Sequence, residues 1–335
     1  MTHDVEMSDQ DLVGMRALRQ WITGERGEYS RVFLIEHGAS TAEVEAVAGR
    51  DDVVLLPAGA GPYQGSARSA HYTGALNEIG DELFFGGRGV ELQDYVAAAF
   101  VQIIGPTAVR VDDESSGAAF LEDAEIARAT GIFPAPLIDP RVLLAGGGAL
   151  RNPKEFDAPR ALRVRADGGV SVGMGGDVIA SVSDLQRIST APVSGMPRWR
   201  DRDWIGRYLG ATDLLKMLRI SNGAVRISGF GWCGIDDALA DAEPEASDPF
   251  LLETADGFVL ADPTTLRRQL LSPATATVVA ATQTSTTLEV AAERVARQLS
   301  GPPREARFLC CRAVAALGIH LGERFDAAPR TDVGR

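Results

Sequence analysis

Residues 251–299 read LLETADGFVLADPTTLRRQLLSPATATVVAATQTSTTLEVAAERVARQL, and they decide the fold of the C-terminal part of the chain. Two apolar runs, Phe250–Glu253 and Phe258–Ala261, flank Asp256-Gly257, and this spacing is a strong signal of a β-hairpin. A third apolar run, Leu266–Leu271, follows directly. The pattern predicts three short strands in succession.

Start signals for three helices follow the strands. Ser272-Pro273 supplies an N-cap and a first-turn proline for a helix through Ala274–Ala281. Thr286 then precedes Glu289 by three residues, as in a capping box, and apolar residues recur on one helical face after it: Leu288, Ala291, Ala292, Val295 and Leu299. A third helix is predicted over Arg304–Leu317, with Gly318 at the left-handed C-terminal position.

Three strands followed by three helices is the layout of the winged helix-turn-helix. Residues 251–299, with AVAALG at 313–318, resemble more closely the PqqD-like recognition element of RiPPs, the ribosomally synthesised and post-translationally modified peptides. That domain binds the leader of a precursor peptide. The resemblance covers about a quarter of the chain, residues 248–325, and its motifs are loose patterns without an invariant signature.

The resemblance implies a peptide-binding site. In the family, a disordered leader adds a strand to the edge of the third strand, and its side chains enter a cleft walled by the third helix. Carried over to this chain, the edge consists of Leu266, Arg267, Arg268, Gln269 and Leu270, and the wall carries Arg304, Arg307, Phe308, Cys311 and Arg312. Arginines on both sides suit acidic leader residues, because charge-assisted hydrogen bonds are strong.

A simpler interpretation of the same arginines stays open. Charged side chains on an edge strand also protect that edge against aggregation, and arginines on an exposed helix face are often no more than solvated.

Composition narrows the class of protein. The chain has 335 residues with 45% apolar content and a mean hydropathy of −0.01, which is ordinary for a globular protein of two or three domains. No apolar run approaches the ~18 residues of a membrane span, and the first twenty residues lack the apolar core of a secretory signal. We therefore expect a cytoplasmic protein without a membrane partner.

The charge balance argues against a nucleic-acid partner. The net charge is −13, and binding to nucleic acid depends largely on neutralising phosphates. Residues 248–325 contain eight acidic residues and eight arginines, so the acidity lies in the rest of the chain.

The segments before residue 248 predict an α+β or α/β fold. Residues 1–150 alternate strands and helices, which favours a partly parallel sheet: strands Arg31–Glu36, Asp52–Leu56 and Thr107–Val111, and helices Val90–Ile104 and Gly117–Ala129. Residues 151–240 form a mixed segment with a hairpin at Leu162–Val172, a helix at Asp203–Arg219 and a strand at Ala224–Ser228. Ala238–Asp248, acidic and containing Pro244, predicts a linker.

Sites for cofactors or metals are poorly supported. The glycine-rich loop at Gly59–Gly65 lacks G-x-G-x-x-G spacing and contains Pro62, which has no N–H to offer an anion, and Gly86–Gly89 is only a weak second candidate. Cys233, Cys310 and Cys311 have no C-x-x-C spacing, and the four histidines are scattered. We expect no catalytic residue, no cofactor and no metal, and we expect Cys310 and Cys311 to point in different directions.

The sequence thus predicts a non-enzymatic adaptor that binds a leader peptide. Its length, its arginine- and alanine-rich composition and its C-terminal recognition element are similar to those of the daptide-type RiPP recognition proteins. That similarity implies as partners a precursor peptide, a dehydrogenase that oxidises its C-terminus and an aminotransferase that uses pyridoxal phosphate (PLP). Two alternatives stay open: a RiPP tailoring enzyme with its catalytic site in residues 1–150, and a winged-helix DNA-binding regulator.

Overall fold

The computed structural model describes residues 8–152, 156–189, 193–194, 202, 204–219 and 224–324. The chain forms two compact units, an N-terminal unit of Met1–Glu122 with Ala135–Gly206 and a C-terminal unit of Asp123–Pro134 with Arg207–Arg335. Sheets and helices are mixed in both, so the expected α+β or α/β class is confirmed at that level. Within the described ranges, every helix is too short or too polar to cross a lipid bilayer.

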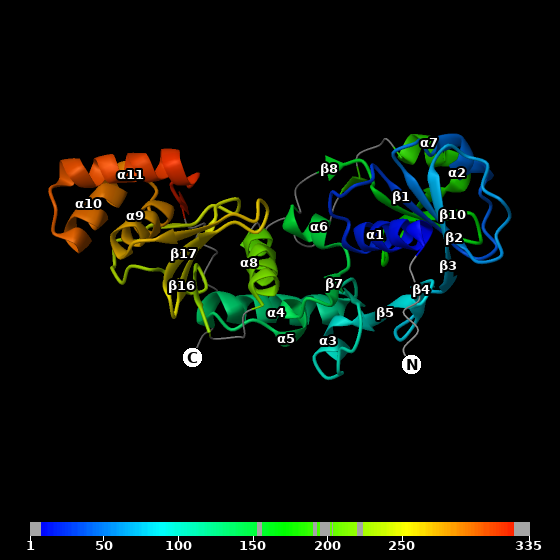
Figure 1. Ribbon diagram of the computed structural model, residues 1–335, viewed down its shortest axis with the longest axis horizontal. Helices are drawn as coiled ribbons and strands as arrows, with labels where there is room; N and C mark the ends of the chain where they lie inside the picture. Colours follow the sequence, from blue (N-terminus) through cyan, green and yellow to red (C-terminus); the bar gives the residue numbers. More distant parts are fainter. Residues whose placement is uncertain are drawn as a thin grey trace, which may run out of the picture. The chain divides into compact units, whose positions relative to one another are not determined.

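A ten-stranded mixed sheet forms the centre of the N-terminal unit, in the order β11-β10-β9-β1-β2-β3-β4-β5-β6-β7 (Figure 1). Its strands are β1 (Val32–Ile35), β2 (Val53–Pro57), β3 (Arg68–Gly74), β4 (Glu82–Phe85), β5 (Arg88–Asp94), β6 (Thr107–Arg110), β7 (Val142–Leu144), β9 (Ala161–Val164), β10 (Gly169–Val172) and β11 (Val178–Ser181). Strands β9 to β11 belong to this sheet, although the sequence analysis placed them in a separate middle segment.

Helices cover both faces of this sheet. Phe33 and Val54 pack with α2 (Ala42–Val47) and α7 (Leu185–Ile188), and the alternate positions, such as Leu34, pack with α1 (Asp9–Thr23). Both faces of β1 and β2 are therefore buried, as expected for parallel strands. The remaining elements are α3 (Tyr95–Ala98), α4 (Glu114–Thr130), α5 (Ala135–Ile138), α6 (Gly147–Arg151), the 3-10 turn Val182–Asp184, and the pair β8 (Phe156–Asp157) and β12 (Val193–Ser194).

The helix predicted over Val90–Ile104 is wrong. Residues 88–94 form β5, which pairs with β4 and β6, and Asp94 caps the four-residue α3 by accepting from the N–H groups of Val96 and Ala97. The apolar residues fit a helical period, but Val90 and Leu92 also alternate with Glu91, which is the period of a strand. Because the segment pairs with two neighbouring strands, it forms a strand and not a helix.

The C-terminal unit contains a five-stranded sheet in the order β14-β13-β16-β17-β18. Its elements are β13 (Arg226–Ser228), β14 (Gly231–Trp232), β16 (Phe250–Thr254), β17 (Gly257–Ala261), β18 (Arg268–Leu271), α9 (Pro273–Gln283), α10 (Leu288–Leu299) and α11 (Pro303–Leu317), with α8 (Trp204–Leu218) spanning the division between the units. The predicted order of three strands and three helices at 250–317 is confirmed. Ser272 caps α9 and Gly318 is left-handed, both as predicted.

The predicted capping box of the second helix is wrong in detail. Thr287, not Thr286, is the N-cap, and its hydroxyl accepts from the N–H of Val290. Thr286 instead hydrogen-bonds through its N–H and its hydroxyl to Asp241. The spacing of Thr286 and Glu289 favoured the wrong start, because the side chain and the N–H of Thr286 are bound to Asp241.

Helices α9, α10 and α11 share one hydrophobic core with the sheet (Figure 1). Leu251 and Leu260 contribute to this core from β16 and β17, and Cys310 contributes to it from α11. Cys311 is exposed, so the two neighbouring cysteines do point in different directions, as predicted. The opposite face of the sheet packs on α8, where the guanidinium of Arg207 lies 4.3 Å from the Phe250 ring.

A fully buried arginine joins α10 to the end of α9. The guanidinium of Arg294 donates from Nε to Asp237 at 2.9 Å, and from Nη1 to the carbonyl of Thr284 and the hydroxyl of Ser285, each at 2.9 Å. It also reaches the carbonyl of Ala281 at 3.3 Å. A cation is favourable at these carbonyls because they form the negative end of the α9 dipole.

We predict that Arg294→Ala lowers the free energy of unfolding by about 3–5 kcal/mol, because it leaves Asp237 and buried acceptors without their partner. Arg297→Ala is the matched control on the same helix. Its exposed pair with Glu293 contributes about 0.5 kcal/mol or less. Urea unfolding of both variants checks the difference, and equal stabilities would contradict this assignment.

Candidate functional site

Strand β18 lies at the end of its sheet and pairs with β17, so its other side is an open edge within the described part of the chain. Arg268, Gln269 and Leu270 are exposed, and Leu270 is 76% accessible. An open edge presents unpaired backbone N–H and C=O groups, which is what a strand from another chain binds. We call the outward side of Arg268–Leu271 the β18 edge.

One hydrogen bond fixes which backbone groups point outward. The N–H of Asp262 donates to the carbonyl of Arg267 at 3.0 Å, and the register pairs Leu260 with Gln269. Bonded and non-bonded pairs alternate along antiparallel strands, so Arg267, Gln269 and Leu271 direct their backbone groups at β17. Arg268 and Leu270 therefore direct their N–H and C=O groups out of the sheet.

The register also assigns side chains to faces. Gln269 lies opposite Leu260, which belongs to the core shared with α9, so Gln269 is on the helix-covered face. Leu270 lies opposite Val259 and is on the other face, together with Arg268. The exposed leucine and arginine of the edge thus point away from α9, α10 and α11.

Leu266 lies in the loop before β18, not in the strand. Its φ is 58°, one of three positive values among the described non-glycine residues, and the residue is 64% exposed. Asp262 builds this loop by accepting from the N–H groups of Thr264 and Thr265. A branched apolar residue costs free energy in the left-handed region, where glycine is usual, and sequence reasoning gave no sign of this conformation.

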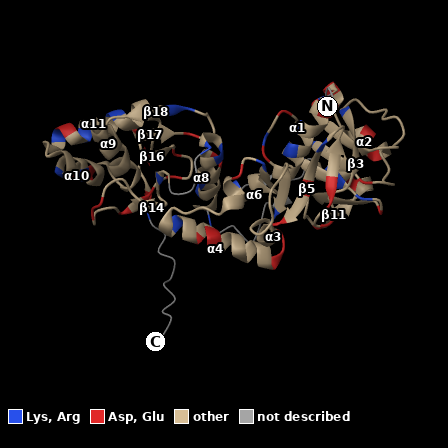
Figure 2. Cartoon of the chain, turned by 60° about the horizontal axis from the view of Figure 1, so that its bottom comes forward, with Lys and Arg blue, Asp and Glu red and all other residues tan. Residues whose placement is uncertain are grey.

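The residues of α11 that were predicted to bind peptide lie on different sides of the helix. Phe308 is 61% exposed, on the side away from the buried Cys310, and the guanidinium of Arg312 lies 5.8 Å from its ring. Arg307 lies on the flank toward α10, where its Nη1 is 3.1 Å from Glu289. Arg304 and Cys311 are exposed. Figure 2 shows the basic residues along α11 and at the entry to β18.

A groove between α10 and α11 has a volume of about 490 Å³. We call it the α10–α11 groove; Ala292, Ala296, Gly301 and Pro303 line it, with Glu289, Glu293, Arg297 and Arg307 at its charged positions. These charges pair with one another, Glu293 with Arg297 and Glu289 with Arg307. Of the predicted wall, Arg307 alone belongs to this groove.

No family model, curated protein or solved structure matches the chain. Its function is therefore inferred from the residues and their geometry.

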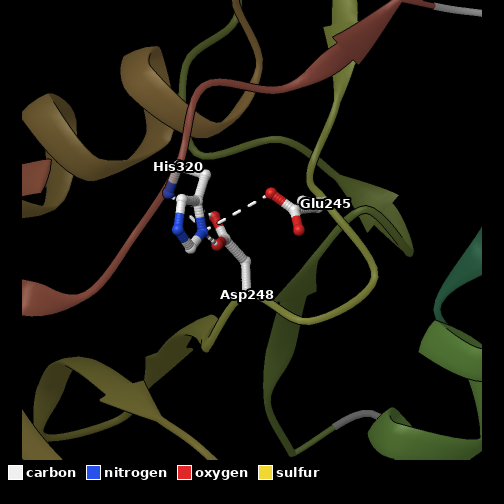
Figure 3. Close-up of side chains that lie close together, drawn as sticks. All are labelled: Glu245, Asp248 and His320. Carbon is white, nitrogen blue, oxygen red and sulfur yellow. Dashed lines mark hydrogen bonds and ion pairs between the residues drawn. The ribbon is translucent and has the colours of Figure 1, made fainter.

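A second cluster, missed by sequence reasoning, joins Asp248 to His320 (Figure 3). Nδ1 of His320 is 2.7 Å from the buried carboxylate of Asp248 and 3.5 Å from Glu245. Asp248 also accepts from the backbone N–H of His320 at 3.1 Å and from Gln283 at 3.0 Å. Residues 72 positions apart meet here, so no local pattern in the sequence could reveal the contact.

This cluster holds the segment after α11 against the segment before β16. The three groups lie within 4.8 Å of one another, as metal ligands would, but the oxygens of Asp248 already accept N–H groups. Just beyond His320, β19 (Glu323–Arg324) pairs with β15 (Ala242–Glu243). The segment predicted to be a linker is therefore packed into the C-terminal unit.

The N-terminal unit contains parallel strands, and enzyme sites in such sheets form at the carboxyl ends of the strands. Strand β1 lies between β9 and β2, parallel to both, and ligands of open α/β sheets bind at such a switch in strand order. Here Glu36, directly after β1, is 2.6 Å from Nη2 of Arg163 and accepts from the N–H of Ala166. The protein's own ion pair fills this position.

The loop Gly59–Gly65 leads from β2 into β3 and not into a helix, so it has no helix N-terminus to offer a phosphate. Elsewhere in this unit, burial raises the pKa of Tyr72 to about 12, and hydrogen bonds from Ser115 and Ser116 lower the pKa of Asp113. Tyr72 therefore stays neutral and Asp113 stays ionised at pH 7.

We predict that His320 stabilises the protein more at low pH. Its hydrogen bond to Asp248 raises the pKa of His320 above 6.5 in the folded protein. The extra stability is therefore fully present below about pH 6.5, the pKa of His320 in the unfolded chain, and disappears as the pH rises through the pKa in the folded protein. Because the imidazole is exposed, the amount is below about 1 kcal/mol. Urea unfolding of the wild type and His320→Gln at pH 5.5 and 8.5 measures it. A difference that is larger at pH 8.5 would refute the prediction.

Proposed function

We propose that the protein is a leader-binding adaptor of RiPP biosynthesis, which holds a precursor peptide on the β18 edge by strand addition. The observation that carries this proposal is the pair of outward-facing backbone positions, Arg268 and Leu270, on a strand whose outer side pairs with no other strand in the described part of the chain. A disordered peptide that adds to them gains directional hydrogen bonds and completes the sheet.

The order of the elements supports the same function. Residues 250–317 fold as three strands followed by three helices around one core, which is the layout of the PqqD-like winged helix that the sequence resembles. The edge in that layout is the third strand, here β18, and it is the exposed end of this sheet. Phe308 and Arg312 add an exposed aromatic and a cation on the third helix.

The proposed partners follow from the resemblance to daptide-type recognition proteins. They are the precursor peptide itself, a dehydrogenase and a PLP aminotransferase, to which the adaptor would present the peptide. The N-terminal unit is large enough to dock such enzymes, and the filled position at Glu36 and Arg163 favours docking over catalysis.

Peptide binding is better supported than DNA reading. Glu305 lies between Arg304 and Arg307 on α11, and Arg307 already pairs with Glu289 of α10. A helix that reads DNA needs cations free to neutralise phosphates, and the whole chain carries a net charge of −13.

The test uses a fluorescein-labelled leader peptide, taken from a precursor gene that neighbours the gene of this protein, and measures its anisotropy. We expect a Kd of about 1 µM or lower for the wild type. Leu270→Pro should weaken binding about tenfold, because it removes one outward N–H without removing a bond to β17. Leu270→Ala, which keeps that N–H, should weaken it less.

Circular dichroism of Leu270→Pro checks that the variant is folded. The proposal fails if the intact protein binds no leader, or if a folded Leu270→Pro binds the leader as tightly as the wild type.

A further inference from the structure

The face of the sheet away from α9, α10 and α11 carries a row of apolar side chains that runs to the β18 edge. The register places Ile227 opposite Leu252, Leu252 opposite Val259, and Val259 opposite Leu270. Ile227 and Leu252 are buried, Val259 is half-buried, and Leu270 is exposed. Directly opposed side chains are the stabilising contacts of a sheet, so the next residue of this row should be apolar.

A second row ends in a cation. Phe250 lies opposite Ala261, which lies opposite Arg268. Phe250 and Ala261 are buried, and Arg268 is exposed at the edge. The residue that continues this row meets a guanidinium, which forms charge-assisted hydrogen bonds with a carboxylate.

The two rows end at the two residues whose backbone groups point outward. A peptide that hydrogen-bonds to Arg268 and Leu270 places the residues opposite them on their own face of the sheet. These peptide residues are two positions apart, because Arg268 and Leu270 are. The peptide residue between them lies opposite Gln269 and faces the helix-covered side.

We infer, on the basis of the proposed function, that the bound peptide carries an apolar and an acidic residue two positions apart, recognised by Leu270 and Arg268 on the face away from the helices. Specificity then lies in these two side chains, in addition to any contact with α11. The order of the two peptide residues reports the direction of the added strand. Apolar before acidic means antiparallel to β18, and acidic before apolar means parallel.

Double-mutant cycles on the labelled leader test this inference. Each acidic residue of the leader is replaced by its amide and each apolar residue by alanine, one at a time, and each variant is measured against the wild type, Arg268→Gln and Leu270→Ala. Arg267→Gln is the matched control, because Arg267 has the same side chain one residue away but lies on the helix-covered face.

We expect one acidic leader residue to couple to Arg268 by about threefold or more in Kd, and an apolar residue two positions away to couple to Leu270. Arg267→Gln should not couple to that acidic residue. The inference is overturned if the coupled leader residues are separated by an odd number of positions, or if Arg267 couples in place of Arg268.

The outcome separates this inference from the proposed function. A leader that binds the wild type and loses affinity with Leu270→Pro, but shows no coupling to Arg268 or Leu270, refutes the inference and leaves strand addition standing. A leader that does not bind the wild type refutes both.

Discussion

The arrangement of the three C-terminal helices depends on the buried guanidinium of Arg294. It binds Asp237 and the last carbonyls of α9 from a position on α10, so it fixes the turn between these helices. Helix α11 packs against both α9 and α10, and the sheet packs against the same core. The position of α11, and with it the exposed Phe308, therefore depends on the core that α9 and α10 form and on the turn that Arg294 fixes between them.

The same unit leaves the β18 edge open. Asp248 and His320 hold the segment after α11, and Asp262 orders the loop before β18. Strand β18 itself ends the sheet, and among the described residues no strand pairs with its outward backbone groups. Folded proteins usually cover or shorten such an edge. An exposed leucine and an arginine on this edge are consistent with a peptide partner, whereas a protective role would need only charge. In the N-terminal unit, by contrast, an ion pair between Glu36 and Arg163 lies at the carboxyl end of β1.

Local patterns predicted much of the C-terminal unit. The Asp-Gly turn, Ser272-Pro273 and Gly318 each act within a few residues, and each lies where it was predicted. Contacts between distant residues were beyond such reasoning. Pairing with β4 makes a strand at β5, where a helix was predicted over Val90–Ile104, and the contact of Asp248 with His320 holds the end of the predicted linker against the C-terminal unit.

The candidate site was predictable only in part. The sequence suggested the residues of β18 and α11. It could not show which backbone groups of β18 point outward, because this follows from the bond from Asp262 to Arg267. Nor could it show the flank of α11 on which Arg307 lies, because this follows from the contact of Arg307 with Glu289. The most direct test of strand addition is residue-resolved amide hydrogen exchange with and without saturating leader peptide. If the peptide adds a strand, the amides of Arg268 and Leu270 gain protection on binding, while those of Gln269 and Leu271 are protected already. Unchanged exchange at Arg268 and Leu270 with a bound peptide would contradict it.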